Sequence, residues 1–368
     1  MSGQAISTTG KDGAPPANRL IAWYDRARRD LPWRAPPGRR PNPYAVWLSE
    51  IMLQQTAAKT VGPYFRRFLV RWPTVGALAA APLDEVMKAW AGLGYYARAR
   101  NLHACAKAVC RNHAGRFPDG TDTLRALPGI GAYTAAAIAA IAFDAQRVPV
   151  DGNIRRVMAR YHAVRGPLRP GDPAIEAHAQ ALLPSPRPGD LVQALMDLGA
   201  TVCTPKRPIC AICPLSGDCK GLAQGIAENL PEKAQKPVRP VRRAAAFFAE
   251  RQDGHVLVRR RPDRGLLGGM TEFPTGNWVL AGTMPPSAAE APLAAEWRKV
   301  PGHVRHVFTH FVAEIEVWRA EVAEVAEVES AAAPERCRWV AKSALFEEAL
   351  PSLMRKVARH ALAGRPKD

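Results

Sequence analysis

The sequence predicts a protein of two domains, an all-α domain followed by an α+β domain. The chain has 368 residues, which is more than one compact domain usually contains. Apolar residues recur at helical spacing from about residue 18 to residue 229. After the proline-rich stretch 231–245, they instead form short segments rich in β-branched and aromatic side chains, which favour strands.

The first domain is expected to be helical throughout. Residues 1–17 are mostly Gly, Ser, Thr, Pro and Ala, and we expect a disordered tail there. The helical domain then covers residues 18–230, with helical runs in AVWLSEIMLQQT, LDEVMKAWAGL, AYTAAAIAAIAF and NIRRVMARYHAV. Prolines and glycines separate these runs. Residues 231–241, rich in proline and basic side chains, predict an extended linker.

The second domain is expected over residues 242–364. Its β-prone segments are AAAFFAE, HVLVRRR, HVFTHFVAEIEVW and CRWVA, and glycine-rich turns such as GLLGGM separate them. A helix from Ala344 to about Leu362 is expected to close the chain. Strands followed by a helix make this an α+β domain.

The charge balance predicts an anionic partner. Lys and Arg number 51 against 33 Asp and Glu, a formal net charge of +18. Such an excess is typical of proteins that bind nucleic acid, although abundant arginine also marks proteins from GC-rich genomes. The longest weakly polar run, residues 131–143, is too short to span a membrane, and the first residues show no secretory signal. We therefore expect a cytoplasmic protein with no membrane partner.

Four of the seven cysteines lie close together in the chain. Their pattern, C-x6-C-x2-C-x5-C, provides the four thiolates that an iron–sulfur cube or a tetrahedral zinc ion requires. Only one CxxC pair is present, whereas zinc ribbons usually carry two, so a [4Fe–4S] cluster is favoured over zinc. We expect it to brace a DNA-contacting loop. The expected ligands are Cys203, Cys210, Cys213 and Cys219.

Two further features point to a reaction on DNA. In LPGIG (127–131), Gly129 and Gly131 allow a tight turn whose backbone N–H groups can hold a phosphate, a weak signal when taken alone. Asp151 follows in VPVDGN and suits a helix N-cap, a position that can also present a carboxylate to a cleft. The order of hairpin, aspartate and cysteine loop is much more specific than any one part.

From about Trp23 to its end, the chain resembles the helix–hairpin–helix glycosylases and, among them, the MutY-type adenine DNA glycosylases. The resemblance implies an all-α helix–hairpin–helix glycosylase domain with a [4Fe–4S] loop, followed by an α+β Nudix-like domain. It rests on LPWR, WLSEIMLQQT, GLGYYARARNLH, LPGIGAYTA, VDGN, QALMDLGATVC and the cysteine loop.

The resemblance also implies catalytic roles. Glu50 would be the acid that protonates N7 of a flipped adenine, helped by an apolar wall that raises its pKa. Asp151 would stay ionised and stabilise the oxocarbenium-like sugar. Tyr133 would lie near that sugar, where endonuclease III-like enzymes place a Schiff-base lysine. A tyrosine in place of that lysine favours base removal without strand cleavage. Asn153 would hydrogen-bond beside Asp151.

Other positions would contact DNA. By resemblance, Gln55 and Tyr95 would enter the duplex around the flipped base. Of the adjacent Tyr95 and Tyr96, one is expected to pack in the core. The adenine pocket would be lined by Trp33, Leu53 and Asp197.

The C-terminal domain is expected to bind rather than hydrolyse, because the Glu-rich magnesium helix of Nudix hydrolases is absent from its sequence. Residues Phe308, Thr309 and His310 match the loop that recognises 8-oxoguanine in this family. Threonine replaces the commoner serine and keeps the hydroxyl. Met270 and Thr271 stand where an aromatic residue is more usual.

These features predict a monomeric, monofunctional, nucleoid-associated adenine glycosylase that acts on A:8-oxoguanine or A:G mispairs in duplex DNA. One alternative is an endonuclease III-like glycosylase and lyase for oxidised pyrimidines, which the missing lysine and the second domain disfavour. A second is a DNA damage-binding protein without catalysis. A third is a Nudix pyrophosphohydrolase fused to a DNA-binding domain.

Overall fold

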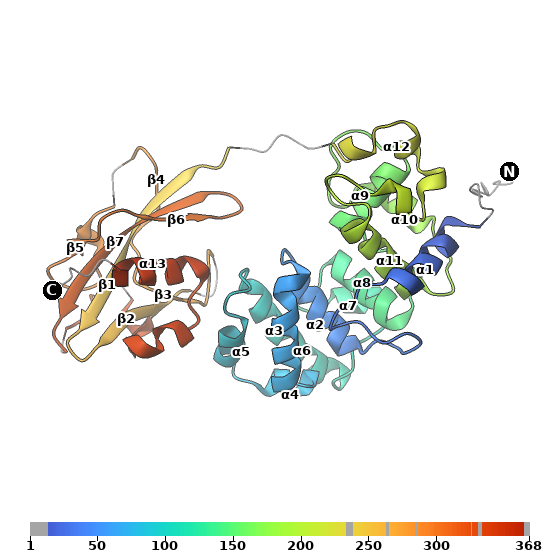
Figure 1. Cartoon of the computed structure of the whole chain (residues 1–368). Helices are drawn as coiled ribbons and strands as arrows, with labels where there is room; N and C mark the ends of the chain where they lie inside the picture. Colours follow the sequence, from blue (N-terminus) through green and yellow to red (C-terminus); the bar gives the residue numbers. More distant parts are fainter. Residues whose placement is uncertain are drawn as a thin grey trace. The chain divides into compact units, whose positions relative to one another are not determined.

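A computed structural model describes residues 14–232, 238–262, 265–283, 286–324, 326–329 and 333–363 (Figure 1). The described residues divide into two compact units. The first contains the residues up to Ala80 and those from Asn101 to 232. The second contains Ala81–Arg100 and the residues from 238 onwards. Residues 81–100 thus group with the C-terminal unit, which differs from the predicted division at residues 231–241.

Twelve α-helices cover the described chain before residue 232, as the apolar periodicity predicts. Helix α1 begins inside the predicted tail, so residues 16 and 17 are helical rather than disordered, and residues 1–13 lie outside the described chain. Helix α5 and the first turn of α6 belong to the second unit. The bounds are α1 Pro16–Ala27, α2 Pro43–Leu53, α3 Ala58–Arg71, α4 Val75–Ala80, α5 Leu83–Trp90, α6 Ala97–His113, α7 Thr121–Arg125, α8 Ala132–Phe143, α9 Gly152–Tyr161, α10 Pro173–Gln180, α11 Pro188–Thr201 and α12 Lys220–Ala223.

Helices α2, α8 and α11 form the centre of the helical unit. Asn42 caps α2 by accepting the Tyr44 N–H at 2.9 Å, and Pro43 provides a preset first turn. Helix α8 is rich in alanine and nearly all of it is buried. A Cβ on Gly189 would lie 2.8 Å from the Ala140 carbonyl oxygen, so glycine lets α11 approach α8 closely. These tight contacts fix the helices that carry the site.

The second unit is built on a sheet of eight strands among its described residues. The central strands β1 (Val241–Arg251) and β7 (Val312–Val322) pair in parallel over their full length. The order is β3-β2-β1-β7-β5, with β4 on β1, β6 on β7 and β8 on β2. The remaining bounds are β2 His255–Arg260, β3 Thr271–Glu272, β4 Val279–Leu280, β5 Arg298–Lys299, β6 Val304–Val307 and β8 Cys337–Ala341.

The single closing helix predicted over 344–362 is wrong in its first part. A 3₁₀ helix covers Lys342–Glu347, and helix α13 begins only at Ser352, after Pro351 (Figure 1). Proline disfavours helical geometry in the residue before it, which explains the break. The apolar face of α13 packs on the sheet core through Leu353, Met354 and Val357. Among the described residues, no helix is long and apolar enough to cross a membrane.

Candidate active site

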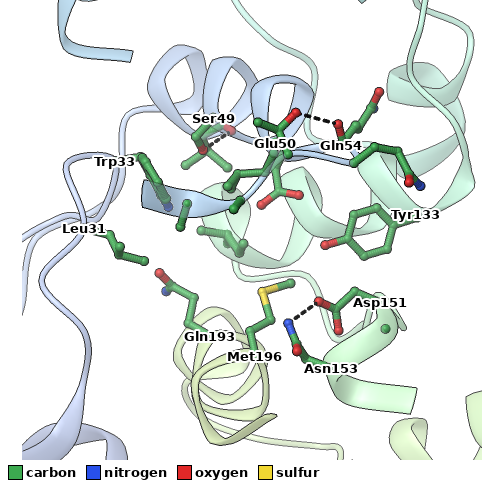
Figure 2. Close-up of a pocket in the computed structure, with 18 of the residues that line it drawn as sticks. Leu31, Trp33, Ser49, Glu50, Gln54, Tyr133, Asp151, Asn153, Gln193 and Met196 are labelled. Carbon is green, nitrogen blue, oxygen red and sulfur yellow. Dashed lines mark hydrogen bonds between the residues drawn. The ribbon is translucent and has the colours of Figure 1, made fainter. Parts of the chain in front are cut away.

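A cleft of about 590 Å³ opens in the helical unit between α2, α8, α9 and α11 (Figure 2). Seven of the predicted site residues line it. Residues that the sequence analysis did not single out line it as well, among them Arg29, Arg34, Ser49, Gln54, Gln193 and Met196. The seven predicted residues are Trp33, Glu50, Leu53, Gln55, Tyr133, Asp151 and Asn153.

Glu50 lies on α2 with its side chain directed into the cleft (Figure 2). The residue is 7% exposed, because most of α2 is buried. Burial, together with the negative charge of Asp151, raises the pKa of Glu50 to about 7, although a hydrogen bond from Tyr133 opposes both effects. The carboxyl group can therefore hold a proton near neutral pH.

Asp151 is the N-cap of α9, as its sequence context predicts. One carboxylate oxygen accepts the Ile154 N–H at 2.7 Å and the other accepts the Asn153 side-chain amide at 3.0 Å. Burial raises the pKa of Asp151, and these hydrogen bonds act in the opposite direction by favouring the ionised form. Two carboxyl groups with different surroundings thus face one cavity.

Tyr133 lies in the first turn of α8 and its hydroxyl group points toward the two carboxyl groups (Figure 2). Burial raises its pKa well above the usual value, and the charges of Glu50 and Asp151 add to this effect. The phenol therefore remains a hydrogen-bond donor. Nearby, the Gln54 amide donates to the Thr134 hydroxyl at 3.2 Å, which ties α2 to α8 beside the cleft.

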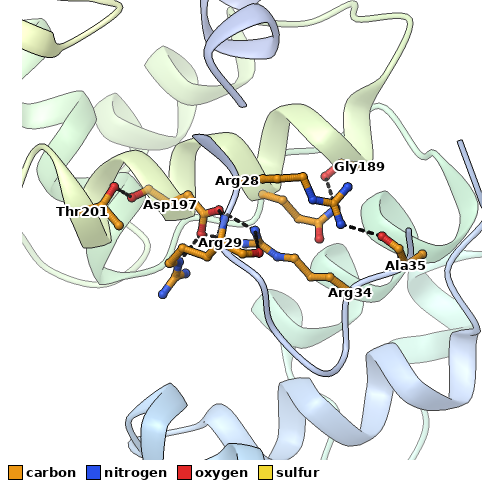
Figure 3. A network of polar contacts seen from close by, with 8 residues as sticks. Arg28, Arg29, Arg34, Ala35, Gly189, Asp197 and Thr201 are labelled. Atoms are coloured by element: carbon orange, nitrogen blue, oxygen red, sulfur yellow. Dashed lines mark hydrogen bonds and ion pairs between the residues drawn. The ribbon is translucent and has the colours of Figure 1, made fainter. Parts of the chain in front are cut away.

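Asp197, which the resemblance places in the wall of the adenine pocket, lies outside the lining of the cleft. Its side chain is fully buried. Arg29 and Arg34 surround its carboxylate instead (Figure 3), with Arg34 Nη2 donating to Oδ1 at 2.7 Å and the Arg29 N–H donating to Oδ2 at 3.0 Å. A buried carboxylate requires such partners. Asp197 therefore holds two arginines that themselves line the cleft.

The hairpin between α7 and α8 depends on one glycine rather than two. Gly129 has φ +74°, and a Cβ there would lie 2.6 Å from the Asn101 Cβ. Gly131, the N-cap of α8, has φ −87° and open space where a side chain would be. Only Gly129 thus requires the freedom of glycine. The N-terminus of α8 has no side-chain cap.

The four cysteines of the predicted metal loop line one cavity, together with Arg160. Arg160 is almost fully buried and donates to the Cys203 sulfur at 3.4 Å and to the carbonyls of Thr204 at 2.7 Å and Leu230 at 2.8 Å. Burial raises the pKa of the Cys213 thiol to about 12. Among the described residues, no three His, Cys, Asp or Glu side chains converge on a single metal ion position.

One arginine joins this loop to the cleft. Arg156 Nε donates to the Cys203 carbonyl at 2.8 Å, and its Nη2 donates to the Asn153 side-chain oxygen at 2.9 Å. Asn153 in turn donates to Asp151. The close approach of α9 and α11 makes this possible, since a Cβ on Gly199 would lie 2.6 Å from that of Asn153.

The remaining predicted DNA contacts lie in the second unit. Tyr95 is 52% exposed with φ +47°, whereas Tyr96 is the buried member of the pair. Phe308 packs on Phe311 in the turn between β6 and β7, and leaves Thr309 and His310 exposed at the tip. The Tyr95 hydroxyl lies 3.4 Å from Thr309 Oγ1, at hydrogen-bonding distance.

Comparison with known proteins identifies the family to which each unit is similar. Residues 48–185 match the model of the HhH-GPD superfamily base excision DNA repair proteins, and residues 245–360 match the NUDIX domain. A thermostable thymine-DNA glycosylase of known structure aligns with a TM-score of 0.51 and 30% identity over 56% of this chain and 95% of its own. These matches confirm the predicted fold of a helix–hairpin–helix glycosylase domain with a Nudix-like domain.

Curated mammalian relatives match nearly the whole chain. The adenine DNA glycosylase of Mus musculus is 35% identical over 93% of this chain and 77% of its own length. That of Homo sapiens is 35% identical over 92% and 72%. The enzyme of Mycobacterium tuberculosis is 46% identical over 53% of this chain and 64% of its own. The chain belongs to the adenine DNA glycosylase family of base-excision repair enzymes.

Proposed function

We propose that this protein hydrolyses the N-glycosidic bond of adenine mispaired with 8-oxoguanine or guanine in duplex DNA, and leaves an abasic site. The observation that carries the proposal is the buried Glu50, whose pKa is raised to about 7 beside a second carboxyl group in a cleft. An acid and a carboxylate facing one cavity are the machinery of glycosidic bond cleavage. Family membership identifies adenine as the base to test.

Glu50 supplies the proton in this mechanism. It transfers its proton to N7 of the flipped adenine, so that the electrons of the breaking C1′–N9 bond pass to a neutral leaving group. The Tyr133 hydroxyl donates to the Glu50 carboxyl group and stabilises the carboxylate left after transfer. Water that attacks C1′ gives up a proton, which restores the acid.

Asp151 stabilises the positive charge that develops on the sugar. Its carboxylate is held in place by the Ile154 N–H and by Asn153. Arg156 orients Asn153 in turn. A carboxylate fixed by two donors needs little rearrangement when the oxocarbenium-like sugar forms, which is the condition for electrostatic catalysis.

The enzyme is expected to remove the base without cutting the strand. A lyase step requires an amine that attacks C1′ to form a Schiff base. No lysine is among the described residues that line the cleft, and Tyr133 occupies the position by resemblance. A phenol whose pKa is well above its usual range is a poor nucleophile at neutral pH.

The adenine is expected to lie against Trp33 and Leu53, which supply an apolar wall. Asp197 acts through Arg29 and Arg34 rather than by touching the base. Gln55, in a left-handed conformation just after α2, is exposed beside the cleft and is proposed to enter the duplex.

The other DNA contacts follow the resemblance. Tyr95 is proposed to wedge the stack, and the hairpin at Gly129 and Gly131 to hold a phosphate through its backbone. The loop Phe308, Thr309 and His310 is proposed to recognise 8-oxoguanine opposite the adenine. The enzyme would act as a monomer on nucleoid DNA in the cytoplasm.

The cofactor is proposed to be a [4Fe–4S] cluster on Cys203, Cys210, Cys213 and Cys219. All four cysteines line one cavity, and four thiolates in a loop with a single CxxC pair are the donor set on which the proposal depends. Bound, the cluster would brace the loop rather than take part in the reaction. Iron and acid-labile sulfide analysis tests this: about four irons per chain support it, and stoichiometric zinc contradicts it.

The decisive test is a single-turnover assay on an A:8-oxoguanine duplex, with and without alkali. Strand breaks only after alkali are expected, and Glu50→Gln should slow the reaction by roughly 10²- to 10⁴-fold, the range of general acid catalysis. Glu176→Gln, an exposed change on α10, is the matched control and should be silent. Breaks without alkali would establish a lyase, and binding without product would establish a damage-binding protein.

A further inference from the structure

The loop between α5 and α6, residues 91–96, carries Tyr95, the side chain proposed above to wedge the base stack. Gly92, Gly94 and Tyr95 all have positive φ, at +105°, +70° and +47°. Glycine adopts this region freely, but a residue with a side chain remains there only where its surroundings hold it. The residues that hold this loop therefore also decide where the Tyr95 ring points.

Arg98, in the first turn of α6, donates to two carbonyl groups of the loop. Its Nη2 donates to the Leu93 carbonyl at 3.0 Å and to the Gly94 carbonyl at 3.1 Å. Arg98 is buried, and burial lowers its pKa to about 10, so the guanidinium group is still charged at neutral pH. Hydrogen bonds from a charged donor are strong in such a place. Arg98 thus fixes the two residues directly before Tyr95.

The same guanidinium group lies near two aromatic rings. Its Cζ is 5.2 Å from the centre of the Trp90 ring and 5.5 Å from that of the Tyr95 ring. Both distances allow a cation–π interaction. Trp90 is fully buried and donates through Nε1 to the Gly94 carbonyl at 3.1 Å. Arg98 therefore connects the Tyr95 ring to the buried end of α5.

Tyr95 and Arg98 differ sharply in exposure. About half of Tyr95 is open to solvent, where its ring can meet a duplex, whereas Arg98 is buried. Arg98 also lies outside the lining of the adenine cleft. An effect of Arg98 on the reaction would therefore pass through the loop. A ring that is already oriented loses less conformational entropy on entering the base stack than a ring on a loosely held loop.

We propose that Arg98 is a positioning residue, which holds the Tyr95 ring ready to enter the duplex and thereby sets how readily the adenine is flipped. The proposal rests on the wedge role given to Tyr95 in the proposed function. Flipping costs free energy, and a side chain that fills the opened stack offsets part of it. A misplaced ring offsets less, so loss of Arg98 slows adenine removal without any contact between Arg98 and the base.

Two readouts on an A:8-oxoguanine duplex test the proposal, with the full, cluster-loaded protein in excess. One is the single-turnover rate of adenine removal. The other is the fluorescence of a 2-aminopurine placed beside the 8-oxoguanine, which rises when a wedge unstacks it. Arg98→Lys keeps the charge but lacks the planar fork and the flat face of the guanidinium group. It should lower the rate about tenfold, the effect of one charged hydrogen bond, and reduce the fluorescence rise.

Arg355→Lys is the matched control. Arg355, on α13, also donates to two carbonyl groups, that of Leu350 at 3.2 Å and that of Phe346 at 2.9 Å, and its Cζ lies 5.9 Å from the centre of the Phe346 ring. It braces the turn before α13 instead of the loop 91–96, so its substitution should leave both readouts unchanged. Equal losses in Arg98→Lys and Arg355→Lys would reflect a general loss of bracing and would overturn the proposal.

A double-mutant cycle separates positioning from a structural role. If Arg98 acts through Tyr95, then Arg98→Lys should change neither readout further in the Tyr95→Ala background. Additive losses, or a full fluorescence rise in Arg98→Lys, would overturn the proposal. Trp90→Phe removes another donor to the Gly94 carbonyl and repeats the test if Arg98→Lys does not fold. It should lower the rate about threefold, as expected for a neutral hydrogen bond.

The two readouts also distinguish failure of this proposal from failure of the proposed function. If the wild type raises the fluorescence but releases no adenine, the glycosylase function fails, and the fluorescence of Arg98→Lys alone decides the positioning role. If Tyr95→Ala keeps the full fluorescence rise, Tyr95 is not the wedge and the role of Arg98 is overturned with it. Adenine release by the wild type would still support the proposed function in that case.

Discussion

Two buried carboxyl groups of the helical unit, those of Glu50 on α2 and Asp197 on α11, have opposite surroundings. Glu50 receives one hydrogen bond, from Tyr133, and faces the carboxyl group of Asp151. Asp197 is also buried but is bound by the guanidinium groups of Arg29 and Arg34. Burial alone therefore does not identify a catalytic acid. The partners decide whether a buried carboxyl group holds a proton for transfer or fixes the structure around it.

The largest effect is expected from breaking the Asp197 cluster. Asp197→Ala leaves Arg34, whose side chain is only 4% exposed, without its carboxylate. Removal of one member of a buried ion pair costs about 3–5 kcal/mol, and we expect a loss of that size in the free energy of unfolding. Denaturant titration measures it.

The control for Asp197 lies on the same helix. Asp190 pairs with Arg187 at the surface, so Asp190→Ala should cost only about 0.5 kcal/mol. Equal losses in the two variants would contradict the view that Asp197 is a structural anchor.

Glu50→Gln is expected to raise the free energy of unfolding, whereas Asp197→Ala lowers it. The pKa of Glu50 is about 7 in the folded protein and near 4.5 when unfolded. As the pH rises from 4.5 to 7, only the unfolded state gives up the proton, so the wild type loses stability. Glutamine has no such dependence, and the variant should gain on the order of 3 kcal/mol over the wild type between pH 4 and pH 8. If the free energies of unfolding of the wild type and the variant changed equally with pH, the raised pKa of Glu50 would be excluded.

The same pKa predicts the pH dependence of the reaction. Because the acid must be protonated, the single-turnover rate should fall about tenfold per pH unit above pH 7, with the plateau below it. Substrate binding measured over the same range separates protonation of the catalyst from loss of affinity. A rate that stays constant up to pH 9 would remove Glu50 from the role of acid.

Tyr133→Phe sharpens the comparison by removing the one hydrogen bond that lowers the pKa of Glu50. The alkaline limb should move to higher pH, while the rate at pH 6 falls about tenfold through loss of one charged hydrogen bond. If Tyr133 had a purely structural role, the substitution would lower the rate and leave the alkaline limb of the rate–pH profile at the same pH. The rate–pH profile distinguishes the two.

The smallest effect is expected in the second unit. Tyr95→Phe removes the hydroxyl that lies 3.4 Å from Thr309 Oγ1, and should reduce the preference for A:8-oxoguanine over A:G by threefold or less. A double-mutant cycle with Thr309→Val measures the coupling. Additive effects would show that the two hydroxyls act separately.

The sequence predicted those features that are encoded locally. Helical periodicity, the N-cap at Asp151 and the cysteine spacing all depend on neighbouring residues, and the first two are confirmed. Pro351 also signalled the break before α13, although the expected helix ran through it. The role of Glu50 came from the resemblance, because α2 alone favours an ordinary surface or first-turn residue.

Features that depend on distant pairs were not predicted. The resemblance places Asp197 in the pocket wall, whereas its arginine partners lie 163 and 168 residues away in the chain, where no local pattern predicts them. The arginines and Gln193 were missed for the same reason, although they lie in or near motifs that had been singled out. The grouping of residues 81–100 with the C-terminal unit is likewise a tertiary fact.

The parallel pairing of β1 with β7 has a consequence for synthesis. Every one of its eleven pairs joins residues 71 positions apart, from Val241 with Val312 to Arg251 with Val322. At roughly 5–20 residues per second, a ribosome takes several seconds to supply the partner of β1. During that time the apolar middle of β1, from Ala244 to Ala249, has no β7 to cover it. Until β7 is made, this strand is therefore an unpaired apolar edge, the kind of segment that aggregates most readily during synthesis.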